Sequence, residues 1–324
     1  MDWNTPSITH LLERALEEDH ALADATTRLT VPAELTAQAE VYAQQPCVLA
    51  GLGLAARVFA VYAALARQAG TPAGPPVVAT HRAEIFDGVR LQPGDTALVL
   101  RGPAHTLLAC ERLVLNLLQR LSGIATLTRQ YVDAVAGLRA VILDTRKTAP
   151  GLRALDKYAV TCGGGRNHRT DLSAAILVKN NHIKLAGGVE RALERARAGR
   201  RPGQKIEIEV RTPAEIAAAL AGGAERVLLD NMKPEQVREA LALIAGRVPV
   251  EVSGGVRLAT VRAYAETGCD FISVGAITHS APAAELAMRI IPVGDGAVGG
   301  GTRGGASVSA EHALGSAPLH GQDA

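Results

Sequence analysis

The feature that most constrains the fold is a regular alternation of short apolar segments and helical segments between residues 141 and 274. The apolar segments have the composition of buried strands and span residues 141–144, 175–179, 206–210, 226–230, 248–252 and 271–274. Helical periodicity lies between them, at 189–198, 213–221, 234–244 and 257–267. Continuous apolar strands alternating with helices imply a parallel sheet covered by helices. Repeated units of similar spacing favour an α/β (TIM-like) barrel, which can be incomplete, over an open doubly wound sheet.

The residues before this alternation predict a different kind of domain. Helical spacing marks residues 8–18 and 52–69, and strand-like segments lie at 29–31, 37–42, 47–50, 83–85 and 96–101. This mixture predicts an α+β N-terminal domain over residues 1–115. A long apolar helix from residue 105 is expected to break at Ser122 and Gly123. The barrel domain is then expected over 116–293, with a last helix that can return to the N-terminal domain.

The C-terminal segment and the overall composition exclude several classes of protein. Residues 294–324 are rich in glycine without apolar periodicity, so we expect a disordered tail. The net charge is only +2 and aromatic residues make up 3%, which argues against a nucleic-acid partner. No apolar run is long enough to span a membrane, and no signal peptide is recognisable. The four cysteines lie far apart, so we expect a reduced, cytoplasmic protein.

Positive charge is concentrated in one segment, residues 144–183. Its basic residues outnumber its acidic ones, and they are Arg146, Lys147, Arg153, Lys157, Arg166, Arg169 and Lys179. They are interleaved with the glycine run 163–165. Packing cations together is unfavourable unless an anion is bound among them, since like charges repel. The segment therefore predicts a site for a small polyanion.

Polar residues also follow the predicted strands, where a barrel of this kind places its active groups. Ser253-Gly254-Gly255 and Gly275 follow the last two strands, and such loops can hold a phosphate through backbone N–H groups. The alternative is that these are ordinary strand-to-helix turns.

Two carboxylates are expected inside the barrel. Glu207 and Glu209 are two residues apart on a strand and face the same side. Buried carboxylates are unfavourable unless a cation is near. Glu209 and Asp230 could hold Mg²⁺ together with substrate phosphate oxygens. Salt bridges to Lys147 or Lys179 are the alternative, and both can hold.

Other chemistries have little support. Residues 51–56 match the G-x-G-x-x-A dinucleotide pattern, but no acidic residue follows at the required spacing. A Walker loop is absent from the sequence, and so is the G-x-S-x-G elbow of serine hydrolases.

Several long motifs occur together and in one order. They are EDHALADATT at 18–27, TRKTAPGLRALDKYAV at 145–160, GGGRNHR at 163–169, LVKNNHI at 177–183 and VLLDNMKPE at 227–235. In these motifs the chain resembles the quinolinate phosphoribosyltransferase family, up to about Pro292. The resemblance implies an α+β domain packed on an incomplete α/β barrel. It also implies dimers, or multiples of dimers, whose active site is completed across the interface.

The resemblance further implies a reaction and its cofactor. Quinolinate and phosphoribosyl pyrophosphate would react with Mg²⁺ present, giving nicotinate mononucleotide, pyrophosphate and CO₂ in NAD biosynthesis. The quinolinate carboxylates would be bound by Arg146, His168 and Arg169, with Arg112 from the partner subunit. Lys147 and Lys179 would contact the anionic groups of both substrates.

The remaining implied roles concern the sugar phosphate. Glu209 and Asp230 would serve the ribose hydroxyls and Mg²⁺, and with the two lysines they form the implied catalytic set. The 5′-phosphate would be framed by Ser253, Gly254, Gly255, Gly275 and His279. Gly163–Gly165 would shape the loop that presents His168 and Arg169. Arg153, Lys157 and Arg166 are left as surface or interface charges.

Three positions depart from the family pattern, namely Asn180, Ala174 and Asp171. Loss of two acids there could weaken a water-mediated metal contact. Three rival functions are open to a chain with this pattern: a homologue of the molybdenum-transport-associated type acting on another base, a silent anion-binding protein, and a metal-dependent barrel lyase or isomerase. Arg146, His168 and Arg169 favour the transferase over the first, and the lysines together with the carboxylates favour it over the others.

Overall fold

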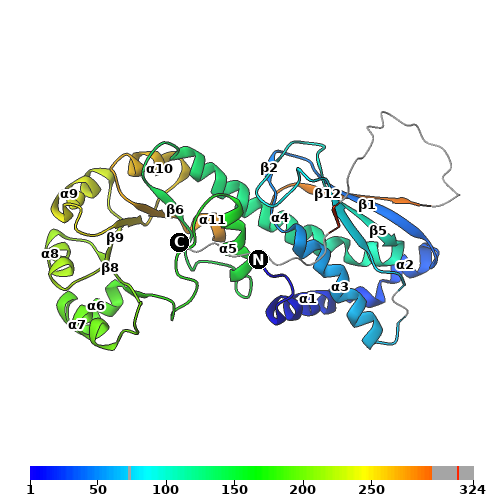
Figure 1. The fold of residues 1–324 in the computed structure, drawn as a ribbon, viewed down its shortest axis with the longest axis horizontal. Coiled ribbons are helices and arrows are strands. Elements are labelled where there is room, and N and C mark those ends of the chain that lie inside the picture. Colours follow the sequence, from blue (N-terminus) through cyan, green and yellow to red (C-terminus); the bar gives the residue numbers. More distant parts are fainter. Residues whose placement is uncertain (72–73, 294–311, 314–324) are drawn as a thin grey trace. The chain divides into compact units, whose positions relative to one another are not determined.

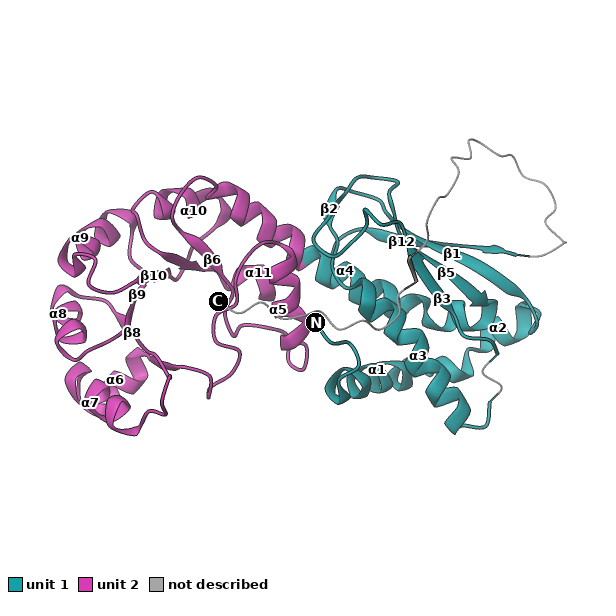
Figure 2. Cartoon of the chain, in the orientation of Figure 1, with its two compact units in different colours: residues 1–123, 283–324 teal, residues 124–282 magenta. Residues whose placement is uncertain are grey.

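A computed structural model describes residues 1–71, 74–293 and 312–313 of the chain (Figure 1). The chain divides into two compact units (Figure 2). Unit 1 comprises residues 1–123 and 283–324, and unit 2 comprises residues 124–282. The expected boundaries at 115 and 293 therefore differ from those found by about ten residues. We expected a disordered tail over residues 294–324; residues 312–313 instead form a strand, and residues 294–311 and 314–324 lie outside the described part.

Unit 1 is built on an antiparallel sheet with the strand order β12-β1-β5-β3-β13. Its strands are β1 (Thr36–Ala43), β3 (Val78–His81), β5 (Thr96–Pro103), β12 (Leu286–Pro292) and β13 (His312–Ala313), and a small second sheet joins β2 (Cys47–Val48) and β4 (Arg90–Leu91). The helices of the unit are α1 (Pro6–Glu18), α2 (Ala25–Thr30), α3 (Leu52–Gln68) and the first part of α4 (Ala104–Ala134), with a 3₁₀ turn at Ala21–Ala23. Every second residue of β1 is buried, which is the alternation of a half-covered strand.

Two strands expected in unit 1 are not strands. Residues 29–31 end helix α2, because Asp24 caps that helix by accepting a hydrogen bond from the Thr27 amide at 3.0 Å. Residues 83–85 lie after the strand that actually pairs, β3, which spans Val78–His81.

The break expected at Ser122 and Gly123 is also wrong, because α4 continues to Ala134. Both residues are buried, and the Ser122 hydroxyl accepts a hydrogen bond from the Ala50 amide at 3.1 Å. A glycine in a helix costs about 1 kcal/mol, which the packing of a buried helix exceeds.

The chain returns to unit 1 after residue 282, as expected, but as a strand rather than a helix. β12 pairs with β1 in antiparallel register, with Ala39 opposite Ile290. Leu286, Met288 and Ile290 alternate at the two-residue spacing of a strand, and this short-range signal was missed.

Unit 2 contains a parallel sheet of six strands in the order β6-β11-β10-β9-β8-β7. They are β6 (Val141–Leu143), β7 (Ile176–Val178), β8 (Ile206–Val210), β9 (Arg226–Asp230), β10 (Val250–Ser253) and β11 (Phe271–Ser273). The helices are α5 (Arg153–Cys162), α6 (Asn180–Ala186), α7 (Val189–Gly199), α8 (Pro213–Ala221), α9 (Pro234–Ile244), α10 (Leu258–Ala265) and α11 (Ala276–His279). Helices α6 to α10 surround the strands (Figure 2).

The sheet is an incomplete barrel, as the sequence predicted. The first strand of the unit, β6, pairs with the last, β11, which is the cyclic order of a barrel. Within the described residues β6 and β7 do not pair with each other. Arg166 lies beside β6 instead, donating its amide to the Ile142 carbonyl at 2.9 Å.

The register of the strands determines which side chains share the interior of this barrel. Glu207 lies opposite Arg226, Leu228 lies opposite Glu251, and Asp230 lies opposite Ser253. Paired residues of neighbouring strands point to the same side. The alternate residues are apolar and buried under the helices, among them Ile208, Val227 and Val252. The interior face therefore carries the polar residues.

Candidate active site

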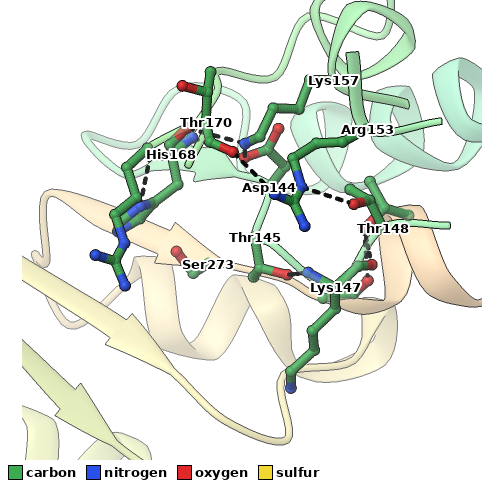
Figure 3. A network of polar contacts seen from close by, with 12 residues as sticks. Asp144, Thr145, Lys147, Thr148, Arg153, Lys157, His168, Thr170 and Ser273 are labelled. Carbon is green, nitrogen blue, oxygen red and sulfur yellow. Dashed lines mark hydrogen bonds and ion pairs between the residues drawn. The ribbon is translucent and has the colours of Figure 1, made fainter. Parts of the chain in front are cut away.

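A buried ion pair fixes the loop at the end of β6. Lys157, on α5, places its Nζ 2.5 Å from Asp144 Oδ1 and 3.0 Å from the His168 carbonyl oxygen (Figure 3). The same Asp144 oxygen accepts the amide of His168 at 2.8 Å. Asp144 is fully buried and Lys157 is 3% exposed. We expected Lys157 to be a surface or interface charge. It is instead a buried residue that joins β6, α5 and the loop bearing His168.

The glycine run 163–165 lets this loop pack closely on its neighbours. A Cβ on Gly163 would lie 2.5 Å from the Ala125 carbonyl oxygen, and one on Gly165 would lie 2.8 Å from the Thr128 side chain. The run thus shapes the loop that presents His168 and Arg169, as the sequence suggested.

Two arginines of the cationic segment lie within electrostatic reach of each other. Burial, and then the charge of Arg146, lower the pKa of Arg169. Arg169 donates one hydrogen bond to the Ala175 carbonyl oxygen at 3.0 Å. The Nε of Arg146 is buried without a hydrogen-bond partner among the described residues. A buried N–H donor without an acceptor destabilises the folded state, and a second guanidinium nearby adds charge repulsion. The arrangement of Arg146 and Arg169 is therefore suited to binding an anion.

Lys147 and Lys179 follow β6 and β7, and both are exposed. The Lys147 side chain extends away from the Asp144–Lys157 pair in Figure 3. Its carbonyl oxygen accepts the Thr278 hydroxyl at 2.8 Å, which ties the end of β6 to α11. Both lysines are thus at the carboxyl edge of the sheet.

Of the two ring nitrogens of His168, only Nδ1 makes a hydrogen bond within the described residues, and the buried Nε2 has no hydrogen-bond partner there. Nδ1 accepts the amide of Arg169 at 2.7 Å, while Nε2 lies 3.2 Å from Glu207 Oε2 and 3.5 Å from Glu251 Oε2. Burial lowers the pKa of His168. Burial, and then the charge of Glu207, raise the pKa of Glu251 to about 7. This cluster is interior to the barrel and lies outside the set that the resemblance implied, apart from His168.

The carboxylates Glu209 and Asp230 converge at the ends of β8 and β9. Arg211 Nη2 lies 3.2 Å from Asp230 Oδ2 and 3.6 Å from Glu209 Oε1. Asn180 donates its amide to Glu209. Burial, and then the charge of Asp230, raise the pKa of Glu209. The ion-pair partner is thus Arg211 rather than the lysines we considered, and its position directly after the strand 206–210 was a signal that could have identified it.

The two glycine turns predicted to hold phosphate have the required backbone. Gly254 has φ of 92°, and a Cβ there would lie 2.4 Å from Asn231 Oδ1. Gly255 has φ of 65° and open space beside it. Gly275 precedes α11, and a Cβ there would lie 3.0 Å from Lys147 Cδ and 3.3 Å from His279 Nε2. At the predicted phosphate site these glycines therefore leave the backbone without covering side chains.

Arg112 is exposed on α4 and belongs to unit 1. Its role across a subunit interface stays a prediction. Arg226 and Glu251 were missed in the sequence. Their alternation with apolar residues on strands 226–230 and 250–253 was the available signal.

Cations, carboxylates and glycine turns at the carboxyl edge of a parallel barrel define an enzyme that acts on anionic, phosphorylated substrates. The family description "Quinolinate phosphoribosyl transferase, N-terminal domain" matches residues 24–122, and the C-terminal domain of the same enzyme matches residues 124–289. The chain belongs to the quinolinate phosphoribosyltransferase family.

Relatives of known sequence and structure agree with this assignment. The nicotinate-nucleotide pyrophosphorylase [carboxylating] of Mycobacterium leprae is 40% identical over 293 residues, which cover 87% of this chain and 94% of that protein. The probable enzyme of that name from Bacillus subtilis is 43% identical over 204 residues, covering 63% of this chain and 71% of the relative. The structure of NadC from Streptococcus pyogenes has a TM-score of 0.83 and 38% identity, and covers 91% of this chain and 100% of its own.

Proposed function

We propose that the protein transfers the phosphoribosyl group of phosphoribosyl pyrophosphate to quinolinate with decarboxylation, giving nicotinate mononucleotide, pyrophosphate and CO₂. Membership of the family supports the reaction. The observation that carries it in the structure is the pair Arg146 and Arg169, with a buried guanidinium nitrogen that lacks a partner in the described residues. A pyridine dicarboxylate supplies the acceptors that such a pair requires, because guanidinium and carboxylate groups match in bidentate geometry.

Phosphoribosyl pyrophosphate would lie across the other strand ends. Lys147 and Lys179 would contact its anionic groups and those of quinolinate. The 5′-phosphate would accept hydrogen bonds from backbone N–H groups and side chains of Ser253, Gly254, Gly255, Gly275 and His279. Support comes from the positive φ angles of Gly254 and Gly255, which only a residue without Cβ adopts readily.

Glu209 and Asp230 fit a Mg²⁺ ion bound together with the substrate. The charge of Asp230 raises the pKa of Glu209, after the larger effect of burial, and Arg211 lies against both carboxylates, which supports a cation at this site. Mg²⁺ prefers one or two carboxylates together with water and phosphate oxygens. When bound, the ion would neutralise charge on the departing pyrophosphate.

The chemistry needs no side-chain nucleophile. The ring nitrogen of quinolinate forms a bond to the anomeric carbon as the bond to pyrophosphate breaks. The developing oxocarbenium charge is stabilised by the nearby carboxylates Glu209 and Asp230. The resulting cationic ring then accepts the electron pair of the bond to the 2-carboxylate, so CO₂ leaves and a proton takes its place.

The experiment that tests this function is turnover of quinolinate by the purified protein with phosphoribosyl pyrophosphate and Mg²⁺. Nicotinate mononucleotide and CO₂ are expected in equal amounts. Turnover of nicotinate or another base, with none of quinolinate, would refute the assignment.

We also propose a homodimer, or a multiple of dimers, in which Arg112 completes the partner's active site. Its support is the exposure of Arg112 on α4 and the resemblance to the family. Mixing Arg112→Ala protein with Arg146→Ala protein should restore activity in exchanged dimers, because one of the two sites then keeps both arginines. If the mixture stays inactive, the shared site is wrong.

A nucleic-acid partner is not proposed, since the net charge is only +2. Among the described residues, every helix is too short or too polar to cross a bilayer. We propose a cytoplasmic location, which the small number and wide spacing of the cysteines in the sequence support, because proteins of reducing compartments seldom carry a disulfide framework.

A further inference from the structure

Arg153, which we expected to be a surface or interface charge, is half-buried between two loops of unit 2. Its Nε donates a hydrogen bond to Thr148 Oγ1 at 3.1 Å, and its Nη1 donates to the Thr170 carbonyl oxygen at the longer distance of 3.4 Å (Figure 3). A planar guanidinium with several fixed donors suits such a double contact better than an ammonium group does. One side chain therefore joins two segments that are distant in sequence.

The two segments carry the arginines predicted to bind quinolinate. Thr148 follows Arg146 by two residues, and Thr170 directly follows Arg169. Burial, and then the charge of Arg146, lower the pKa of Arg169, so the two guanidinium groups repel each other. Before an anion binds, this repulsion acts to separate the loops. A side chain that joins them opposes the separation.

The position of Arg153 in its helix does not account for a cation there. Arg153 is the first residue of α5, and the dipole of a helix favours acidic side chains in the first turn. Asp156 is the acid of that turn, and its Oδ2 accepts the Ala149 amide at 3.0 Å. A cation at the first position gains nothing from the helix dipole, so its contribution comes from the two loops.

The loop after β6 is also held by groups other than Arg153. The Thr278 hydroxyl donates to the Lys147 carbonyl oxygen at 2.8 Å, and the Lys147 amide donates to Thr145 Oγ1 at 3.0 Å. Lys147 should therefore keep its place, and its predicted contact with phosphoribosyl pyrophosphate, when Arg153 is replaced. The part that should move is the loop that bears Arg169.

We propose that Arg153 is a positioning residue that joins the loops bearing Arg146 and Arg169, and so sets the spacing of these two guanidinium groups for the carboxylates of quinolinate. The inference rests on the proposed function for the binding of quinolinate. His168 and Arg169 remain substrate-binding residues, and Arg153 acts through Arg169 without touching the substrate.

The joining of the loops can be tested without substrate. Amide hydrogen exchange of the full-length protein, followed by mass spectrometry, should be faster over residues 169–175 in Arg153→Met than in the wild type, because a loop that loses a contact opens more often. Exchange in α9 should be unchanged. Equal exchange over residues 169–175 in the two proteins would overturn the proposal. Since this readout needs no turnover, it still decides the role of Arg153 if quinolinate is not the substrate.

Kinetics test the consequence for substrate. In Arg153→Met we expect the KM for quinolinate to rise about tenfold or more, because a small misplacement of a binding group is costly, with the KM for phosphoribosyl pyrophosphate changed less than about twofold. The melting temperature should change by less than about 3 °C, since the helix loses no favourable charge. An unchanged KM for quinolinate, or equal rises of both KM values, would refute the role.

Two variants separate the hydrogen bonds of Arg153 from its charge. Arg153→Lys keeps the charge but not the fork of donors, so its KM for quinolinate should stay close to that of Arg153→Met. A wild-type KM in Arg153→Lys would show that charge alone suffices, and the proposal would fail. Adding Thr148→Val to Arg153→Met should raise the KM no further, because both changes remove the same hydrogen bond. Multiplying effects would contradict the bridge.

Arg201→Met is the matched control for loss of an arginine from this loop. Arg201 Nη2 donates to the Ser173 carbonyl oxygen at 2.8 Å, but Gln204 Nε2 donates to the same oxygen at 2.7 Å and would still hold it. The KM for quinolinate should therefore be unchanged in Arg201→Met. If it rises as much as in Arg153→Met, any lost contact of the loop has the same effect and the proposal is wrong.

Discussion

Replacing Lys157 by methionine should destabilise unit 2 severely, although Lys157 is not among the residues predicted to contact substrate. The change keeps most of the length of the side chain but removes its charge. Asp144, fully buried, would then have lost the ammonium group 2.5 Å from its Oδ1. Breaking a buried pair on one side costs about 3–5 kcal/mol, because the remaining charge is uncompensated. For a unit of this size, that corresponds to a fall in melting temperature of about 6–20 °C.

The loss should depend on pH in a direction that the structure fixes. Burial raises the pKa of Asp144 even with Lys157 present, and loss of the lysine would raise it further. Between the unfolded pKa, near 3.8, and the raised folded pKa, the native state binds the extra proton. The stability of the variant therefore falls as pH rises through this window. The deficit relative to the wild type should be smaller at pH 5 than at pH 8.

The measurement is thermal and urea unfolding followed by circular dichroism between pH 5 and pH 8. Arg238→Met is the control, since it breaks an exposed pair with Glu235 at 3.8 Å and should cost less than about 1 kcal/mol. Adding Asp144→Asn to Lys157→Met should recover at least half of the loss, because asparagine removes the stranded charge and still accepts the His168 amide. A loss below about 1 kcal/mol, or a double variant as unstable as the sum of the single variants, would refute the reasoning.

Three further predictions follow from the predicted phosphate and metal sites and from the interior cluster. Gly254→Ala should weaken binding of phosphoribosyl pyrophosphate at least tenfold, because its Cβ would lie 2.4 Å from the side-chain amide oxygen of Asn231. Gly255→Ala has open space beside it and should cost only about 1 kcal/mol of backbone strain. Isothermal titration calorimetry of both variants measures the difference in binding. Asn180→Asp would place a carboxylate against Glu209, so the Mg²⁺ concentration for half-maximal activity should fall, and an unchanged value would count against the metal assignment. Because the folded pKa of Glu251 is raised from 4.5 to about 7, stability should fall by up to about 3 kcal/mol as pH rises from about 4.5 to 7, and Glu251→Gln should flatten that dependence in urea unfolding.

The barrel could be predicted because its strands are continuous apolar runs and its site residues stand directly after them. Position after a strand is a local property of the sequence, and the carboxyl edge of a parallel sheet gathers such positions. This is why Arg146, Lys179 and Asp230 could be named together. Arg211 directly follows the strand 206–210 and obeys the same rule, so its place at the site could also be predicted from the sequence.

What could not be predicted depends on contacts between distant residues. Lys157 looks like any charged residue of an amphipathic helix, and only the tertiary fold places it on Asp144. Ser122 and Gly123 interrupt a helical pattern in sequence, yet packing around them keeps α4 continuous. The side chain of Glu251, on a strand far along the chain, comes within 3.5 Å of His168 Nε2 only in the folded barrel.

The pairing of β12 with β1 bears on the order in which the chain can fold during synthesis. Residue 39 meets residue 290, so the sheet of unit 1 stays open at the β1 edge until nearly the entire described chain has left the ribosome. Unit 2 is contiguous from residue 124 to 282 and can fold before that edge is covered. Such long-range pairings form slowly, and an open strand edge is a template for association with other chains. A nascent chain stalled before residue 283 would thus contain a folded barrel and an N-terminal sheet whose β1 edge is unpaired. Chaperone binding to β1 would protect such a chain from aggregation.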